Sequence, residues 1–225
     1  MELPNSFVCN GRMFGSDSGK PKLLLGTGNR KKLEELETLL SDLPFQLVSL
    51  REFPNVTEIV EDGTTFEENA IKKARGLAAQ TGLLTLGEDS GLVVDALEGN
   101  PGVYSARFAG LEKDDVKNCL KVLRLMEKLP DNCRGAAFKS VVAVATPDRL
   151  VGVAEGEVRG GMAREMRGAN GFGYDPLFIY GPYGGKTFGE VPPEWKHRVS
   201  HRAQAVEKAK KILEEYVRIQ NSSGA

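Results

Sequence analysis

The stretch LLTLGEDSGLVVDALEGNPGVYSARFAG, residues 83–110, decides the fold of this chain. Its two apolar runs, 83–86 and 92–97, predict β-strands because leucine and β-branched residues lie between glycines. The first run stops at Glu88 and Asp89, which places negative charge at the end of a buried strand. Adjacent carboxylates repel one another and are costly to desolvate, so the pair favours a bound cation or water. A solvated Asp-Ser-Gly turn explains the same residues equally well.

Length and composition restrict the class of protein. The chain has 225 residues, 27% of them charged, and a net charge of −1, so no basic field indicates a nucleic-acid partner. Its three cysteines show no C-x-x-C spacing, which is typical of a reducing compartment. No apolar run approaches the ~18 residues of a membrane span. We expect a cytoplasmic protein with no membrane partner, a flexible extension over 1–20, one domain over 21–219 and a flexible tail over 220–225.

A glycine-rich strand-to-helix turn opens this domain. A short strand at 22–25 is followed by Gly26-Thr27-Gly28-Asn29 and a predicted helix over 30–40, with Asn29 as its N-cap. The first helical turn is Arg30-Lys31-Lys32, although the positive end of a helix dipole favours anions. An anionic ligand bound by free backbone N–H groups would remove this conflict. A solvated charged face, costing up to about 1 kcal/mol, is the alternative.

Further acids follow a second predicted strand. Runs at 45–50 and 56–60 predict strands, and the latter leads into Glu61 and Asp62. A helix over 66–80 comes next, on which Asn69 and Lys73 are four residues apart and therefore adjacent. On their own these two residues are best explained as ordinary surface. The helix at 112–129 and the strands at 136–145 and 150–158 are expected to be scaffold.

Two segments near the C-terminus suit a planar, anionic ligand. The loop GANGFGYDPLFIY, residues 168–180, presents Phe172 and Tyr174 on a glycine-rich turn, which suits a nucleobase, although a core loop is a common alternative. Asp175 caps this turn or accepts from a ring N–H. In 196–202, Ser200 caps a last helix that runs to about 219 and places His201 and Arg202 in its first turn, which repeats the cationic anomaly.

These pieces combine into a nucleotide site. Two histidines without paired cysteines do not favour zinc. The carboxylates Glu61, Glu88 and Asp89 suit Mg²⁺, which is usually completed by substrate phosphates. Together with the cationic turn, Lys73 and the aromatic loop, they predict a site for a nucleoside triphosphate.

Five separated blocks resemble one family. Thr27-Gly28-Asn29 with Lys32, EENAIKKA, EDSGLVVDALEGNPGVYSARFAG, GFGYDP and SHR resemble the Ham1-type inosine/xanthosine triphosphate pyrophosphatases, in that family's order, over residues 22–217. The resemblance implies an elongated α/β fold, in which a long twisted mixed β-sheet is flanked by helices and two lobes enclose a nucleotide cleft. It also implies a Mg²⁺-dependent homodimer that hydrolyses (d)ITP and XTP to the monophosphate and pyrophosphate.

The resemblance also implies residue roles. Asp89 and Lys73 would be catalytic, with Asp89 as the base, and Glu61, Glu88 and Asp89 would hold the metal. The implied substrate contacts are Thr27, Gly28, Asn29, Arg30, Lys31, Lys32, Asn69, Ser90, Phe172, Gly173, Tyr174, Asp175, Lys196, Ser200, His201 and Arg202.

Several positions depart from the family, and two rival functions remain open. Glu88 replaces a frequent aspartate, Lys31 replaces a glycine of bacterial relatives, and Ala203 replaces a frequent glycine. A Maf-type pyrophosphatase of modified pyrimidine nucleotides and a nucleotide-binding sensor without hydrolysis are the rivals. A donor such as His201 or Arg202 would pair with a 6-keto purine and reject adenine.

Overall fold

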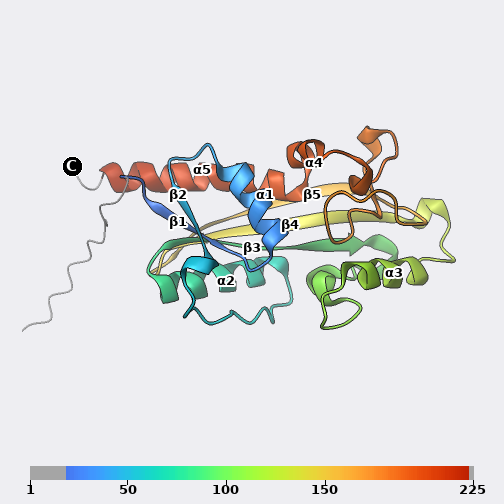
Figure 1. The fold of residues 1–225 in the computed structure, drawn as a ribbon, viewed down its shortest axis with the longest axis horizontal. Coiled ribbons are helices and arrows are strands. Elements are labelled where there is room, and N and C mark those ends of the chain that lie inside the picture. The colour runs from blue at the N-terminus through green and yellow to red at the C-terminus, as the bar shows by residue number, and fades with distance from the viewer. Residues whose placement is uncertain (1–18, 223–225) are drawn as a thin grey trace, which may run out of the picture.

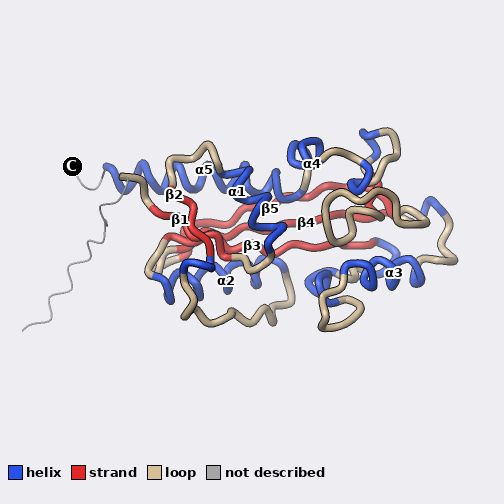
Figure 2. The backbone as a smooth tube through the Cα atoms, viewed as in Figure 1, coloured by secondary structure: helices blue, strands red, loops and turns tan. Residues whose placement is uncertain are grey.

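One mixed β-sheet runs along the whole length of the protein, with helices on both faces (Figures 1 and 2). The computed structural model describes residues 19–222. The strands are β1 (Lys22–Gly26), β2 (Gln46–Ser49), β3 (Leu84–Val94), β4 (Gly135–Ala145), β5 (Leu150–Met162) and β6 (Phe178–Ile179). They lie in the order β2-β1-β3-β4-β5-β6; β1 is parallel to β2 and β3, and the other neighbours are antiparallel. The predicted elongated α/β architecture with a mixed sheet is therefore confirmed.

Two helical layers cover the two faces of this sheet. The helices are α1 (Arg30–Leu40), α2 (Phe66–Thr81), α3 (Asp115–Leu125), α4 (Pro193–Val199) and α5 (His201–Ser222). Figure 1 shows α1, α4 and α5 on one face and α2 and α3 on the other. Helix α2 packs on β3 and β4, whereas α5 packs on β4 and β5. The functional residues of α2 and α5 therefore approach the sheet from opposite sides.

The two larger hydrophobic cores of residues 19–222 lie at different ends of the sheet and explain the long shape. Leucines of α1 such as Leu36 pack with Leu25 of β1 and Leu213 of α5 in one core. Phe138 and Phe178 belong to a second core at the distal end of the sheet. Helices α1, α2, α3 and α5 each bury residues at three- and four-residue spacing, as an amphipathic helix does. The nucleotide cleft that the resemblance implied would lie between these two cores.

No break separates the two predicted strands, because β3 runs through residues 88–91 without interruption. Both the strand end and the alternative of a solvated turn at these residues are therefore wrong. Glu88 and Asp89 lie in the middle of an 11-residue strand, paired with Val142 and Val141 of β4. Successive side chains of a strand point to opposite faces. The two acids therefore reach different helical layers instead of meeting at the end of a strand, and each face supplies its own polar partners.

Other predicted boundaries also differ. Residues 56–60 form no strand and belong to an irregular segment that leads to α2. Helix α3 is shorter than the predicted 112–129 because Asp114 caps it, and α4 had not been predicted. Helix α5 includes residues 220–222 of the expected tail. The rest of that tail, 223–225, and residues 1–18 of the expected extension lie outside the described residues.

Between residues 19 and 222, no helix combines the length and the apolar character that crossing a bilayer requires.

Close packing of α5 on β5 depends on Gly156, and this gives a first prediction. A Cβ atom at Gly156 would lie 2.6 Å from the backbone nitrogen of Ala205 and closer still to the carbonyl oxygen of His201. Because helix backbone cannot yield as a side chain does, Gly156→Ala should lower the free energy of unfolding by about 3 kcal/mol, measured by urea denaturation. Gly181→Ala, which meets no atom within 4 Å, is the matched control. Equal stability of the two variants would contradict this packing.

Candidate active site

The end of β1 exposes one edge of β3 at the two carboxylates. Gly26, the last residue of β1, pairs with Gly87, and β3 continues for seven more residues, as far as Val94. On this side no strand lies beside Glu88, and Nζ of Lys73 donates instead to its carbonyl oxygen at 2.9 Å. Lys73 reaches this point from α2. An ammonium group thus replaces the missing strand and places positive charge where β3 carries negative charge.

Asp89 is a buried carboxylate on the α2 face of β3. It is 6% exposed, and Nδ2 of Asn69 donates to its Oδ2 at 3.0 Å. The backbone N–H of Ser90 donates to its Oδ1 at 2.9 Å. Burial raises the pKa of Asp89 although the ammonium groups of Lys32 and Lys73 oppose the shift. The two lysines thus compensate the buried carboxylate only in part, which suits a general base or a ligand of a cation.

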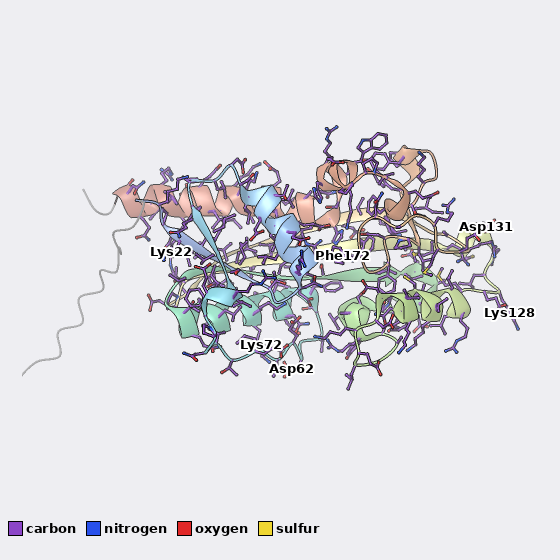
Figure 3. The ribbon with its side chains drawn as sticks, in the orientation of Figure 1. Lys22, Asp62, Lys72, Lys128, Asp131 and Phe172 are labelled. Atoms are coloured by element: carbon purple, nitrogen blue, oxygen red, sulfur yellow. The ribbon has the colours of Figure 1, made fainter. Side chains whose placement is uncertain are left out.

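Glu61 reaches the same point from the irregular segment before α2. An ion pair between Asp62 and Lys72 ties this segment to α2 (Figure 3), and Nη2 of Arg107 donates to the carbonyl oxygen of Glu61 at 3.3 Å. Oε1 of Glu61 lies 3.0 Å from Nζ of Lys73. The acids Glu61 and Asp89, from segments far apart in sequence, therefore converge around one lysine.

Glu88 does not join these two acids. It is fully buried, and Oγ of Ser140 and Nη2 of Arg202 donate to its Oε1 at 2.9 and 3.0 Å. Nζ of Lys32 lies 3.0 Å from its Oε2. Burial alone would raise the pKa of Glu88, but Arg202 and Lys32 hold it well below the usual value. Of the three carboxylates predicted to hold a metal, Glu88 is thus the one that lies in an ion-pair network and not with Glu61 and Asp89.

The remaining donors suit a hard divalent cation. Among residues 19–222, no group of three or more His, Cys, Asp or Glu side chains is arranged as a complete metal site. Mg²⁺ is commonly held by one or two carboxylates, with water and phosphate oxygens completing its shell. Glu61 and the under-compensated Asp89 fit that arrangement, and they line one cavity together.

The glycine-rich turn offers fewer free backbone donors than expected. Oδ1 of Asn29 accepts from the backbone N–H groups of Lys31 and Lys32 at 3.0 and 3.2 Å, as a helix N-cap does. Oγ1 of Thr27 accepts from the N–H of Asn29 at 3.2 Å. Arg30 points outward and pairs with exposed Glu34 at 2.8 Å. The cationic character of this turn at the cavity therefore comes from the side chain of Lys32.

A buried chain of alternating charges connects α1, α4 and α5. Nζ of Lys196 lies 2.9 Å from Oε1 of Glu35 and 2.7 Å from Oδ2 of Asp175. Arg202 pairs with Glu35 and, at 3.0 Å, with Glu88. Burial would raise the pKa of Glu35, but Arg202 and Lys196 outweigh it and keep the pKa below its usual value. Glu35 is therefore the ionised centre of this chain.

Sequence reasoning missed Glu35 as a residue of the site. Only the three cations of the first turn of α1 were singled out. The available signal was the position of Glu35 three residues after Lys32, which places both side chains on one face of the helix. Its partners, Lys196 and Arg202, are 161 and 167 residues away, a separation that no local pattern reveals.

The two rings of the aromatic loop both line the cavity, but they lie in different surroundings. Phe172 lies near the middle of the molecule, beside the start of α1 (Figure 3). The cationic groups of Lys31, Lys196 and Arg202 lie 5.8, 4.6 and 5.6 Å from its ring centroid. Tyr174 is instead buried in the distal core, and its hydroxyl donates to the carbonyl oxygen of Ser105 at 2.8 Å.

Asp175 closes the turn of this loop, one of its two predicted roles. Its Oδ2 accepts from the backbone N–H of Phe172 at 2.8 Å. Burial raises the pKa of Asp175 although Lys196 opposes the shift.

His201 is a neutral, stacked ring at the start of α5. It packs on Phe138, with ring centroids 4.8 Å apart and planes at 13°. Burial, and next the charge of Arg202, hold the pKa of His201 well below its usual value. Within the described residues, Nδ1 of His201 and Nε of Arg202 are buried without a hydrogen-bond partner. Ser200 acts as a cap, since its Oγ accepts from the N–H of Ala203 at 3.1 Å.

One cavity of about 540 Å³ unites most of these groups. Of the predicted site residues, it is lined by Thr27, Gly28, Asn29, Lys32, Glu61, Lys73, Asp89, Ser90, Phe172, Gly173, Tyr174, Asp175, Lys196, His201 and Arg202. The predicted residues outside its lining are Arg30, Lys31, Asn69, Glu88 and Ser200. Lysines and carboxylates gather at the β1–β3 edge, and Phe172 and His201 lie near the start of α5. The cavity thus offers a polyphosphate end and a planar, partly aromatic end.

Comparisons with known proteins agree with this geometry. The model of the Ham1 family matches residues 23–212. A protein of Desulforamulus reducens named dITP/XTP pyrophosphatase is 52% identical over 192 residues, covering 85% of this chain and 95% of that protein. One of the same name from Geobacter sulfurreducens is 47% identical, covering 82% and 92%. A solved HAM1 protein from Coxiella burnetii superposes with a TM-score of 0.79 at 41% identity, covering 87% of this chain and 99% of that one.

The central place of Glu35 gives a second prediction. Glu35→Gln leaves Lys196 and Arg202 buried with less compensating charge and should lower the free energy of unfolding by about 3 kcal/mol in chemical denaturation. Glu34→Gln removes a neighbouring exposed acid and should cost less than about 1 kcal/mol. If Glu35→Gln is no more destabilising than this control, the buried chain does not support the site.

Proposed function

This chain belongs to the Ham1 family, and from that premise we propose that it is a nucleoside-triphosphate pyrophosphatase that hydrolyses dITP, ITP and XTP to the monophosphate and pyrophosphate. The observation that carries the proposal is the shared cavity, in which two lysines and two carboxylates face one end and Phe172 and His201 line the other. By removing purine nucleotides that do not belong in DNA or RNA, such an enzyme cleanses the nucleotide pool.

Lys32 and Lys73 supply the binding charge for a triphosphate. Lys32 extends from the first turn of α1 and Lys73 from α2, so they approach the carboxylates from opposite helical layers. Their present partners are carboxylates, Glu88 for Lys32 and Glu61 for Lys73, at 3.0 Å in both cases. A phosphate group entering here would exchange one anionic partner of each lysine for another, which limits the desolvation cost.

A 6-keto purine fits the donors at the other end. At this end, Nδ1 of neutral His201 and Nε of Arg202 are two of the buried atoms that have no hydrogen-bond partner within residues 19–222, and the Nε–H is a fixed donor. A keto oxygen can accept from it, whereas an adenine 6-amino group would leave it unpaired. Phe172 provides a ring face for stacking. We therefore assign base recognition to these side chains.

Mg²⁺ is the cofactor that we propose. Glu61 and Asp89 would hold it, and bound there it would supply charge neutralisation of the triphosphate. Asn69 orients the Asp89 carboxylate through its 3.0 Å hydrogen bond.

Asp89 is the base that we propose for the chemical step. Its raised pKa makes it a better proton acceptor than an ordinary aspartate, so it can orient a water and take its proton as the water attacks the α-phosphorus. The bond between the α-phosphorus and the bridging oxygen breaks, and Lys32 and Lys73 stabilise the leaving pyrophosphate.

We further propose that the protein works as a homodimer in the cytoplasm, on the nucleotide itself, without nucleic acid or membrane. The balanced net charge of −1 favours neither a nucleic acid nor an anionic lipid surface. The outer face of α3 leaves Val116 and Leu120 about half exposed, and such apolar side chains are typical of subunit interfaces.

A substrate panel tests the proposed activity. With Mg²⁺, the protein should release pyrophosphate from ITP, dITP and XTP with kcat/KM about 100-fold or more above that for ATP, because adenine leaves a buried donor unpaired. UTP and dUTP in the panel test a Maf-type activity on pyrimidine nucleotides. Orthophosphate as first product, equal rates on ATP and ITP, or binding of ITP without turnover would each refute the proposal.

Asp89→Asn should separate activity from stability. Loss of the base should lower kcat for ITP by about 10²–10⁴-fold. Because burial raises the Asp89 pKa in the folded state, its ionisation opposes folding above the unfolded-state pKa. In chelator at pH 7 the variant should therefore melt at a higher temperature than the parent, and this gain should vanish as the pH falls below the unfolded-state pKa. A variant that is fully active, or less stable in chelator, would contradict this role.

A further inference from the structure

The loop that carries Phe172 is held from both sides of the cavity. From α1, Nζ of Lys31 donates to the carbonyl oxygen of Gly171 at 3.2 Å. From α3, Oδ2 of Asp115 accepts from the backbone N–H of Gly173 at 2.8 Å, and Sγ of Cys119 donates to the carbonyl oxygen of Gly173 at 3.4 Å. Neighbours of Phe172 on both sides are therefore fixed by side chains from two different helices.

Helical spacing explains how α3 binds the Gly173 peptide with two side chains. Asp115 and Cys119 are four residues apart, so both lie on the face of α3 that meets the loop. Burial raises the pKa of Cys119 to about 12, which keeps the thiol protonated and able to donate. Between them, one helix face binds both the N–H and the C=O of Gly173.

This contact matters because the glycines of the loop give its backbone wide conformational freedom. Gly171 and Gly173 have φ angles of 75° and 58°, a region that glycine enters readily and leaves as readily. A loop that must be ordered when the ligand binds reduces affinity by the free energy of ordering. Because Gly173 is anchored before the ligand binds, Phe172 does not have to be ordered on binding, and that part of the affinity is kept.

We propose that Asp115 is a positioning residue that sets the Phe172 ring for stacking on the base, and thereby determines affinity for the nucleobase and not for the phosphates. The inference rests on the proposed function and adds a specificity determinant from α3, whose own side chains were expected to be scaffold. Asp115 acts through the Gly173 peptide, to which its hydrogen bond runs.

Three variants isolate this role. Asp115→Ala removes the acceptor, whereas Asp115→Asn loses the charge but keeps an oxygen that can accept from Gly173. Asp114→Ala is the structural control, because Asp114 caps α3 by accepting from the N–H of Lys117 at 3.0 Å and has no part in the contact with Gly173. The measurements are KM and kcat for ITP, the inhibition constant of inorganic tripolyphosphate, and hydrogen exchange of the peptide spanning 168–175.

In Asp115→Ala, KM for ITP should rise roughly tenfold relative to Asp115→Asn, which corresponds to the loss of about one base-stacking contact. Tripolyphosphate has no base, so its inhibition constant should be the same in the two variants. Exchange of the 168–175 peptide should accelerate in Asp115→Ala only. Asp114→Ala should be less stable to heat, yet should keep the parental KM.

Two results separate the inference from the proposed function. If the parent protein releases pyrophosphate from ITP but Asp115→Ala and Asp115→Asn share one KM, the inference is overturned and the function stands. Equal weakening of ITP and tripolyphosphate, or a KM change in Asp114→Ala, would also overturn it, because a general disturbance of α3 would then be the cause. If the parent does not hydrolyse ITP, the proposed function fails. The claim that Asp115 determines affinity for the nucleobase then fails with it.

Discussion

The structure depends on a buried strand that carries two ionised side chains across the middle of a sheet. β3 can do so because β1 ends at Gly26 and leaves one edge of β3 open at Glu88. Lys73 fills that edge by donating to the Glu88 carbonyl oxygen. Since strand side chains alternate, each carboxylate faces a different helical layer and obtains its own counter-charges. One truncated strand thus creates an electrostatic centre inside an otherwise apolar fold.

The two faces use that charge differently. On the α5 face, Glu88 pairs with Arg202 and Lys32 and accepts from Ser140, and the two cations hold its pKa well below the usual value. On the α2 face, Asp89 accepts hydrogen bonds from Asn69 and Ser90, and burial raises its pKa against the charges of Lys32 and Lys73. The two adjacent acids therefore lie in different electrostatic environments. We propose the chemical step for Asp89 alone.

Local patterns predicted much of this arrangement, and long-range pairing accounts for the errors. The caps at Asn29 and Ser200 and the helical phase of α1 follow from neighbouring residues, and the structure has them. The family and its fold followed from five motif blocks and are confirmed. The glycine and polar residues at 87–91 are compatible with a turn, but the pairing of β3 with β4 overrides that local preference. The spacing of Glu35 from Lys32 places it on the same helix face, but its partners lie more than 160 positions away, so local patterns could not reveal the ion pairs that it makes.

The central claim is that Glu61 and Asp89 hold one hard divalent ion opposite the lysines that bind the polyphosphate. The most direct measurement is a crystal structure with Mn²⁺ and an ITP analogue whose α,β-bridge cannot be hydrolysed, with the metal located by its anomalous scattering. The account predicts one peak bonded to carboxylate oxygens of both Glu61 and Asp89 and to phosphate oxygens, with Lys32 and Lys73 on the phosphates. A metal bound to Glu88, or a triphosphate that lies away from the two lysines, would contradict it.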